Sequence, residues 1–227
     1  MANRPRILLA DDHTILLDAF KSLLDRKFQV VGAVTNGRAL TEAAERLKPD
    51  VIVADINMPQ LNGLDALEGL RKQNPTVKVI FLTVNEDVET ASDAIRRGAC
   101  GYVLKKAASS ELFRAIQTVL AGRIYLTPAI SEEPIGVFVA RAKSNATGQK
   151  LSLRQREVLQ LLAEGRSMKE AADALNVTPR TIAFHKYAMM EHLGLKTTAE
   201  LIRHAAELGL VTAQARSSIG PAAPPAC

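Results

Sequence analysis

Five short apolar runs alternate with five helical patterns over the first half of the chain, and this alternation constrains the fold more than any other feature. The apolar runs cover residues 7–10, 28–34, 51–54, 77–82 and 101–104, and the helical patterns lie near residues 14–26, 38–48, 64–73, 88–97 and 109–121. Strands that alternate with helices across short connections form a parallel sheet covered by helices on both faces. We therefore predict an α/β domain over residues 1–127, built on a doubly wound, five-stranded parallel sheet.

Polar residues stand where four of these runs end. Asp11 and Asp12 follow the first run, Asp55 follows the third, Thr83 the fourth and Lys105 the fifth. The carboxyl ends of parallel strands are where ligands collect, and three carboxylates placed there repel one another unless a hard divalent cation such as Mg²⁺ binds. A carboxylate, a metal, a hydroxyl and an ammonium at one edge predict a phosphoryl-transfer site. The carboxylate attacks, and the metal and the ammonium offset charge on the phosphoryl oxygens.

The composition changes after residue 127. Residues 128–149 are rich in Pro, Ser and Gly, which is typical of a linker, although Ile135-Gly136-Val137-Phe138-Val139 could dock on another surface. From residue 150 onward the signals are helical. They include capping boxes that begin at Ser152, Ser167 and Thr197, and a proline, Pro179, at a first helical position. We predict an all-α, four-helix domain over residues 150–214 and a disordered tail over residues 215–227.

The whole chain has 227 residues and a formal net charge of +5. A surplus this small permits nucleic-acid binding without arguing for it, so the case for DNA rests on motifs. No apolar stretch approaches the length of a membrane span, and the first residues do not resemble a signal peptide. Two cysteines, Cys100 and Cys227, make neither a disulfide framework nor a metal motif. We expect a cytoplasmic protein without membrane association.

Residues 168–193 are predicted to form a helix, a short turn and a second helix, the layout of a helix-turn-helix unit. At 100° per residue, an apolar stripe through Ile182 packs the second helix, and Arg180, Phe184 and Tyr187 lie on the opposite side. Two aromatic rings and an arginine outside the core favour a DNA-binding face. The alternative is that both rings pack on the first domain or on a dimer mate.

The chain over about residues 5–122 resembles the receiver domain of bacterial two-component response regulators, which has the flavodoxin/CheY-like fold. The resemblance is carried by Leu8-Leu9-Ala10-Asp11-Asp12, Asp55-Ile56-Asn57-Met58-Pro59, Gly63, Thr83 and Gly101-Tyr102-Val103-Leu104-Lys105-Lys106. It implies that Asp55 accepts a phosphoryl group from a sensor histidine kinase.

The same resemblance implies the metal ligands. Asp12 and Asp55 would hold Mg²⁺ together with the backbone carbonyl of Asn57, and Asp11 would act mainly through water. Asn57 and Asn85 also fall at positions that tune the lifetime of the phosphoryl group in the family.

Three further residues gain roles from the resemblance. Lys105 would pair with the phosphoryl group, and Thr83 would swing to hydrogen-bond it. Tyr102 takes the switch position, where an aromatic ring moves inward as the threonine moves.

The second half, over about residues 150–212, resembles the LuxR-type DNA-binding domain. The motifs are Leu151-Ser152-Leu153-Arg154-Gln155-Arg156-Glu157-Val158-Leu159 and Thr178-Pro179-Arg180-Thr181-Ile182-Ala183-Phe184-His185. With the receiver, they indicate the NarL/FixJ class of response regulators. The resemblance implies that residues 179–193 enter the major groove of double-stranded DNA. The implied base-reading positions are Ala183, Phe184 and Tyr187, and the implied phosphate contacts are Arg180, Thr181 and Lys186.

The sequence therefore predicts a bacterial transcription factor that is switched by phosphorylation, forms a homodimer when phosphorylated and binds paired half-sites. It predicts no enzyme beyond a receiver that promotes its own Mg²⁺-dependent phosphoryl transfer and dephosphorylation. Two alternatives stay open. The receiver could sense a protein or a small molecule instead of phosphate. The chain could also be a Mg²⁺-dependent phosphotransferase with an aspartyl intermediate, although the sequence shows no separate substrate pocket and no nucleotide-binding loop.

Overall fold

The chain divides into two compact units, residues 1–149 and 150–227. The structure, a computed structural model, describes residues 4–130, 134–144 and 151–211. The expected tail over residues 215–227 lies outside the described residues.

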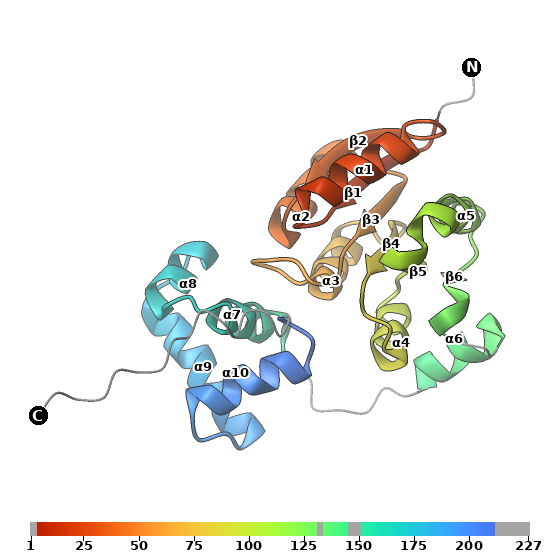
Figure 1. Cartoon of the computed structure of the whole chain (residues 1–227). Helices are drawn as coiled ribbons and strands as arrows, with labels where there is room; N and C mark the ends of the chain where they lie inside the picture. Colours follow the sequence, from red (N-terminus) through yellow and green to blue (C-terminus); the bar gives the residue numbers. More distant parts are fainter. Residues whose placement is uncertain (1–3, 131–133, 145–150, 212–227) are drawn as a thin grey trace, which may run out of the picture. The chain divides into compact units, whose positions relative to one another are not determined.

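The first unit is a six-stranded parallel sheet with the strand order β2-β1-β3-β4-β5-β6 (Figure 1). The strands are β1 (Arg6–Ala10), β2 (Gln29–Val34), β3 (Val51–Ala54), β4 (Lys78–Thr83), β5 (Gly101–Leu104) and β6 (Tyr125–Leu126). The helices are α1 (Thr14–Leu24), α2 (Gly37–Leu47), α3 (Gly63–Gln73), α4 (Val88–Arg96), α5 (Ala108–Leu120) and α6 (Ile135–Ser144), with short 3-10 turns η1 (Lys105–Ala107) and η2 (Pro128–Ile130). The five expected strand-helix units are all present.

The prediction of five strands was wrong by one. The sixth strand, β6, pairs in parallel with β5, so that Gly101 lies beside Tyr125 and Tyr102 beside Leu126. A strand of two residues is too short to produce a hydrophobic period in the sequence. Its position at the edge of the sheet depends on pairing with β5 rather than on a local signal.

Residues that alternate along the central strands build two cores, one on each side of the sheet. In β1, Ile7 and Leu9 face the core formed with α1 and α5, while Leu8 and Ala10 face the core formed with α2, α3 and α4. Strand β3 alternates in the same way. Because side chains of a strand point to opposite faces in turn, a strand with two covered faces is apolar throughout. This explains why these runs are continuous in the sequence.

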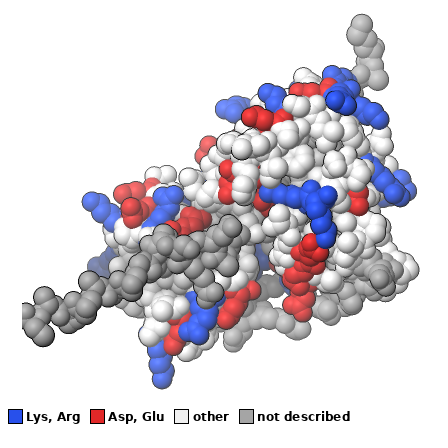
Figure 2. Space-filling model, viewed as in Figure 1, with Lys and Arg blue, Asp and Glu red and all other residues white. Residues whose placement is uncertain are grey.

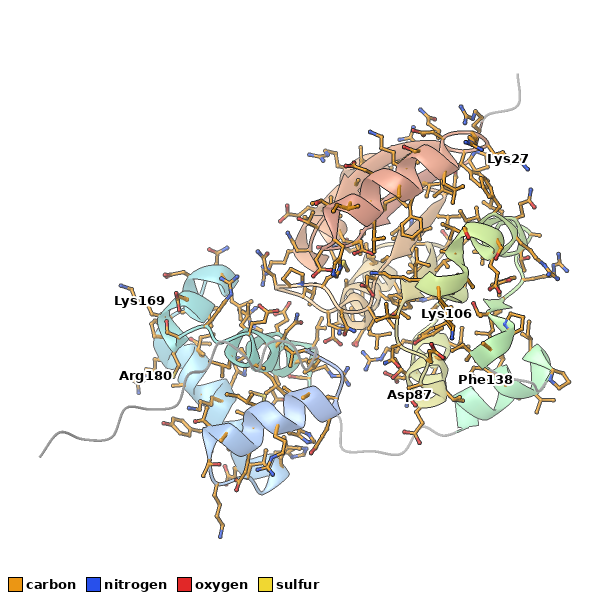
Figure 3. The ribbon with its side chains drawn as sticks, viewed as in Figure 1. Lys27, Asp87, Lys106, Phe138, Lys169 and Arg180 are labelled. Atoms are coloured by element: carbon orange, nitrogen blue, oxygen red, sulfur yellow. The ribbon has the colours of Figure 1, made fainter. Side chains whose placement is uncertain are left out.

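Part of the expected linker packs onto the first unit. Residues 128–130 form η2, and α6 follows them and contacts α4 (Figure 1). Phe138 of α6, labelled in Figure 3, is fully buried in the core that contains α4 and β5. Residues 131–133 and 145–149 of the expected linker lie outside the described residues. The domain boundaries stay predictions, but α6 within them is a docked helix.

The second unit contains four helices, α7 (Leu153–Ala163), α8 (Met168–Leu175), α9 (Pro179–Leu193) and α10 (Thr198–Glu207). All three expected capping boxes form: the side chains of Ser152, Ser167 and Thr197 each accept a hydrogen bond from the backbone N–H three residues on. Gly194 ends α9 with φ +67°, a conformation that glycine adopts without strain. Within the described parts of the chain, no helix is both long enough and apolar enough to span a membrane.

Candidate functional site

Strands β1 and β3 are neighbours in the sheet, and both end at the same edge. Ala10 pairs with Ala54, and the N–H of Asp55 donates to the carbonyl of Ala10 at 2.8 Å. The residues that follow, Asp11 and Asp55, are therefore side by side, and both are buried, with exposed fractions of 3% and 4%. Asp12 next to them is exposed. The structure thus brings together the three acids that the sequence placed at this edge.

Lys105 joins the two buried acids. Its Nζ lies 2.6 Å from Asp11 Oδ2 and 2.6 Å from Asp55 Oδ2. Burial acts to lower the pKa of the Lys105 ammonium, but the hydrogen bonds to Asp11 and Asp55 outweigh burial and raise it. For Asp55, burial raises the pKa further than the shared ammonium lowers it, and the nearby Asp11 adds to the rise. One ammonium divided between two buried carboxylates leaves negative charge that a further cation would stabilise.

A cation has suitable ligands here. One donor atom from each of Asp11, Asp12, His13 and Asp55 lies within 4.8 Å of the others. Hard divalent cations prefer oxygen ligands at short distances, and three carboxylates supply them. The acidic pocket is therefore able to bind a metal ion.

The loop after β3 holds Asp55 from the other side. The N–H groups of Ile56 and Asn57 point at Asp55 Oδ1, at 2.6 and 3.4 Å. The loop returns to α3 at Gly63, whose N–H donates to the carbonyl of Ile56 at 2.8 Å. A Cβ at Gly63 would lie 2.3 Å from the backbone oxygen of Asp55. Only glycine permits this close approach of α3 to the site.

Thr83 and Tyr102 meet at the loop after β4. Thr83 is fully buried, and its Oγ1 accepts a hydrogen bond from the N–H of Asn85 at 3.2 Å. Tyr102 is also fully buried, and its hydroxyl donates to the carbonyl of Asn85 at 2.8 Å. Burial raises the pKa of this phenol, so the hydroxyl keeps its proton. Both expected switch residues therefore contact the same residue of the segment that leads into α4.

Sequence reasoning missed two residues around the pocket, His13 and Thr127. His13 directly follows the acidic pair, and its Nδ1 lies 2.9 Å from Asp12 Oδ1. The buried hydroxyl of Thr127 accepts from the N–H of Leu104 at 3.1 Å and donates to Glu111 at 2.7 Å, which ties the segment after β6 to the end of β5. The position of His13 beside two acids was a usable signal, whereas nothing local marks Thr127.

In the second unit, the side of α9 that was predicted to bind DNA is exposed to solvent. Ile182 and Met189 are fully buried in its core, while Phe184 and Tyr187 have exposed fractions of 70% and 60%. The expected division of this helix into a packed side and an open side is confirmed within the unit. Exposed rings of this size are available for contact with a ligand or a partner.

The other residues of α9 that were predicted to contact DNA are exposed or half-buried. Arg180 is exposed, Thr181, Ala183 and Lys186 are half-buried, and the Lys186 ammonium lies 5.7 Å from the centre of the Tyr187 ring. Lys169 of α8 and Arg180 of α9 lie on the same side of the helix pair (Figure 3). Figure 2 shows positive and negative side chains intermixed over the visible face. The case for DNA binding rests on the local pattern of α9.

Comparisons with known proteins agree with both halves of this picture. Residues 7–117 match the family described as the response regulator receiver domain, and residues 149–205 match bacterial regulatory proteins of the luxR family. The chain is 36% identical over 216 residues to the transcriptional regulatory protein MctR of Rhizobium johnstonii, with 93% of this chain and 99% of that protein covered. It is 34% identical over 199 residues to the nitrate/nitrite response regulator protein NarL of Escherichia coli, with 86% and 91% covered. A structure of RcsB from Salmonella enterica serovar Typhimurium, bound to a promoter in the presence of the phosphomimetic BeF₃⁻, aligns with a TM-score of 0.58 and 26% identity, covering 90% of this chain and 100% of that one.

Proposed function

The chain belongs to the NarL/FixJ class of response regulators, which join a receiver domain to a LuxR-type DNA-binding domain, and from this premise we propose that phosphorylation of Asp55 by a sensor histidine kinase switches its binding to promoter DNA. The observation that carries the proposal is the position of Lys105, whose ammonium lies 2.6 Å from both Asp11 and Asp55. A buried carboxylate beside a fixed ammonium and two further acids has what phosphoryl transfer requires.

The residues fit a magnesium ion. Asp12 and Asp55 would hold it together with the backbone carbonyl of Asn57, and Asp11 would act through water. When bound, the ion supplies positive charge that neutralises the phosphoryl oxygens. The acids would hold that charge at the edge of the sheet, beside Asp55.

The transfer forms one bond and breaks one bond. A carboxylate oxygen of Asp55 attacks the phosphorus of a phosphohistidine, the O–P bond forms, and the P–N bond breaks with its electron pair returning to the imidazole of the donor. The Lys105 ammonium would then pair with the phosphoryl oxygens instead of the Asp55 carboxylate. The Thr83 hydroxyl would rotate away from the N–H of Asn85 and donate a hydrogen bond to a phosphoryl oxygen. The receiver would also promote hydrolysis of its own acyl phosphate, with water as the acceptor.

The signal would leave the site through the loop after β4. Thr83 and Tyr102 both hold Asn85, so rotation of Thr83 changes the path into α4. Helix α6 packs on α4 through the buried Phe138 and precedes the DNA-binding unit in the chain. A shift of α4 would therefore be passed on to α6. A coupling of the order of 1–3 kcal/mol would suffice for a 5–150-fold change in DNA affinity.

In the cytoplasm, helix α9 would enter the major groove. Ala183, Phe184 and Tyr187 would read bases, partly through thymine methyl groups, and Arg180, Thr181 and Lys186 would contact phosphates. The RcsB structure to which this chain is similar is bound to a promoter, which supports DNA binding by this chain. A phosphorylated homodimer would bind two half-sites separated by about 10 bp or a multiple of it.

The first test is labelling with radioactive acetyl phosphate in the presence of Mg²⁺. Asp55→Asn should abolish labelling without unfolding the unit, because it removes the nucleophile and keeps the volume. Asp18→Asn is the matched control, because it removes an exposed acid of α1 and should label as the wild type does. Undiminished labelling of Asp55→Asn would place the phosphorylated residue elsewhere. A wild type that takes no label would favour a receiver that senses another molecule, and catalytic turnover of phosphate onto a second substrate would favour a phosphotransferase.

The second test measures DNA affinity against salt concentration. Phe184→Ala and Tyr187→Ala should each lose roughly 1–3 kcal/mol on a specific duplex and little on a scrambled one, because base contacts carry the sequence preference. Arg180→Ala should weaken both duplexes alike and reduce the salt slope by about one ion, because a phosphate contact releases a counterion wherever it forms. Lys21→Ala, the same change of charge in the first unit, is the control. If the two aromatic variants bind both duplexes as the wild type does, the rings contact protein and not DNA.

A further inference from the structure

His13 lies at the metal pocket without a structural task of its own. Its Nδ1 is 3.1 Å from Asp11 Oδ1 and 2.9 Å from Asp12 Oδ1, so it stands between the two acids. The residue precedes α1 as its N-cap, but its side chain makes no capping hydrogen bond. The side chain is 65% exposed and contributes little to the core. Its position is therefore explained by the acids it contacts.

The spacing of these atoms is that of neighbouring ligands around one ion. Adjacent ligands of an octahedral cation with bonds of about 2.1 Å are separated by about 3.0 Å. The distances from Nδ1 to the two carboxylate oxygens, 2.9 and 3.1 Å, lie on either side of this value. An ion held by Asp12 and Asp55, with Asp11 acting through water, would therefore find the imidazole within its coordination sphere.

Lys105 contacts the acids from the buried side of the pocket, and His13 contacts them from the side exposed to solvent. The ammonium of Lys105 occupies Asp11 Oδ2 and Asp55 Oδ2, and its side chain is only 9% exposed. His13 approaches Asp11 at its other oxygen, Oδ1, and from the exposed side. An ion that enters from solvent would therefore meet the imidazole first. The contacts of Nδ1 with Asp11 and Asp12 would then give way to a bond between Nδ1 and the ion.

An imidazole changes which ion such a site prefers. Carboxylate, carbonyl and water ligands suit Mg²⁺, whereas a neutral imidazole nitrogen suits transition cations and adds little for Mg²⁺. We propose that His13 Nδ1 is a direct ligand of the divalent cation and that it shifts the preference of the acidic pocket from Mg²⁺ toward borderline cations such as Co²⁺ and Ni²⁺. The inference rests on the metal site of the proposed function and adds one ligand to it.

The test compares two cations on the full-length, unphosphorylated protein. Co²⁺ binding is followed by its visible absorption and Mg²⁺ binding by the shifts of backbone amide resonances, for the wild type, His13→Ala and His13→Asn. Both variants should lose roughly 10–100-fold in Co²⁺ affinity. Their Mg²⁺ affinity should stay near that of the wild type. His192→Ala removes an exposed histidine of α9 and should change neither affinity.

A second measurement separates a ligand from a charge nearby. The electron spin-echo signal of bound Mn²⁺ should show a coupled ¹⁴N nucleus in the wild type and in His192→Ala, and none in His13→Asn. Loss of Mg²⁺ and Co²⁺ affinity in equal proportion, an unchanged Co²⁺ affinity, or a nitrogen signal that survives in His13→Asn would each overturn the inference while leaving the metal site intact. A wild type that binds neither cation would overturn the metal site together with it.

Discussion

Replacing Gly63 by alanine should disturb both the stability of the first unit and phosphorylation of Asp55. An added Cβ would lie 2.3 Å from the Asp55 carbonyl oxygen and 3.1 Å from both the Ile56 Cα and the ring of Phe81. Two of these three neighbours are backbone atoms, so they cannot turn aside as a flexible side chain does. The start of α3 must move away from β3 by about 1 Å to restore ordinary contact.

The magnitude follows from two opposing terms. Overpacking a closed site costs about 1–3 kcal/mol, and contact with backbone places this variant near the upper end. Alanine recovers up to about 1 kcal/mol because glycine loses more chain entropy in a helix. The expected net loss is about 2 kcal/mol. Gly69, in the interior of the same helix, is the matched control, because a Cβ there meets no atom of the described residues within 4 Å. Gly69→Ala should therefore stabilise the unit by about 0.5–1 kcal/mol.

Urea unfolding of the full chain, followed by circular dichroism, measures both changes in the free energy of unfolding. The unfolding transition of the second unit should be the same in all variants and serves as the internal reference. Acetyl-phosphate labelling gives the functional readout: Gly63→Ala should label more slowly, because the shifted loop carries the N–H groups that hold Asp55, while Gly69→Ala should label as the wild type does. The reasoning is refuted if Gly63→Ala matches the wild type in both stability and labelling, or if the two alanine variants shift stability in the same direction.

Three further predictions concern α4, α6 and the pocket. Phe138→Ala removes a fully buried ring and should weaken the docking of α6 by about 3 kcal/mol, which speeds hydrogen exchange of α6 amides roughly 100-fold, whereas Val137→Ala, at an exposed neighbour, should not. Burial acts to raise the pKa of Asp93, but ion pairs with Arg97 and Arg96 outweigh burial and lower it. The stability that this carboxylate contributes is therefore present above its unfolded pKa of about 3.9 and is lost as the pH falls through its lower folded pKa. Asp93→Asn should make the free energy of unfolding fall less steeply with decreasing pH. An equally steep loss below pH 4 in that variant would assign the acid sensitivity to other groups. Thr83→Ala should still accept label but lose the gain in promoter affinity caused by beryllofluoride, and a normal gain would remove Thr83 from the switch.

Much of the fold could be predicted because its signals are local. The strands β1, β3 and β5 read as continuous apolar runs, since each is covered on both faces, and the helices of the second unit begin at capping boxes whose two partners are three residues apart. The exposed side of α9 followed from angular spacing alone. The acids at the strand ends were predicted to meet because parallel strands share one carboxyl edge.

Other features depend on contacts between distant residues and left no local trace. Strand β6 exists through its pairing with β5, and the sequence showed that residues 135–139 could dock but not that Phe138 would fill the core beside α4. The hydroxyl of Thr127 became a buried link only when the chain returned to the end of β5.

The sequence alone determined which residues are strand ends, caps and exposed helix positions, because each of these is set by interactions within a few residues along the chain. Only the tertiary structure decided that one ammonium, Lys105, is shared by Asp11 and Asp55, and that His13 stands between Asp11 and Asp12. Those arrangements depend on the order of strands in the sheet and on side-chain rotation at its edge. Neither is encoded in a local pattern, because the energies that fix them come from burial and from charges brought together by the fold.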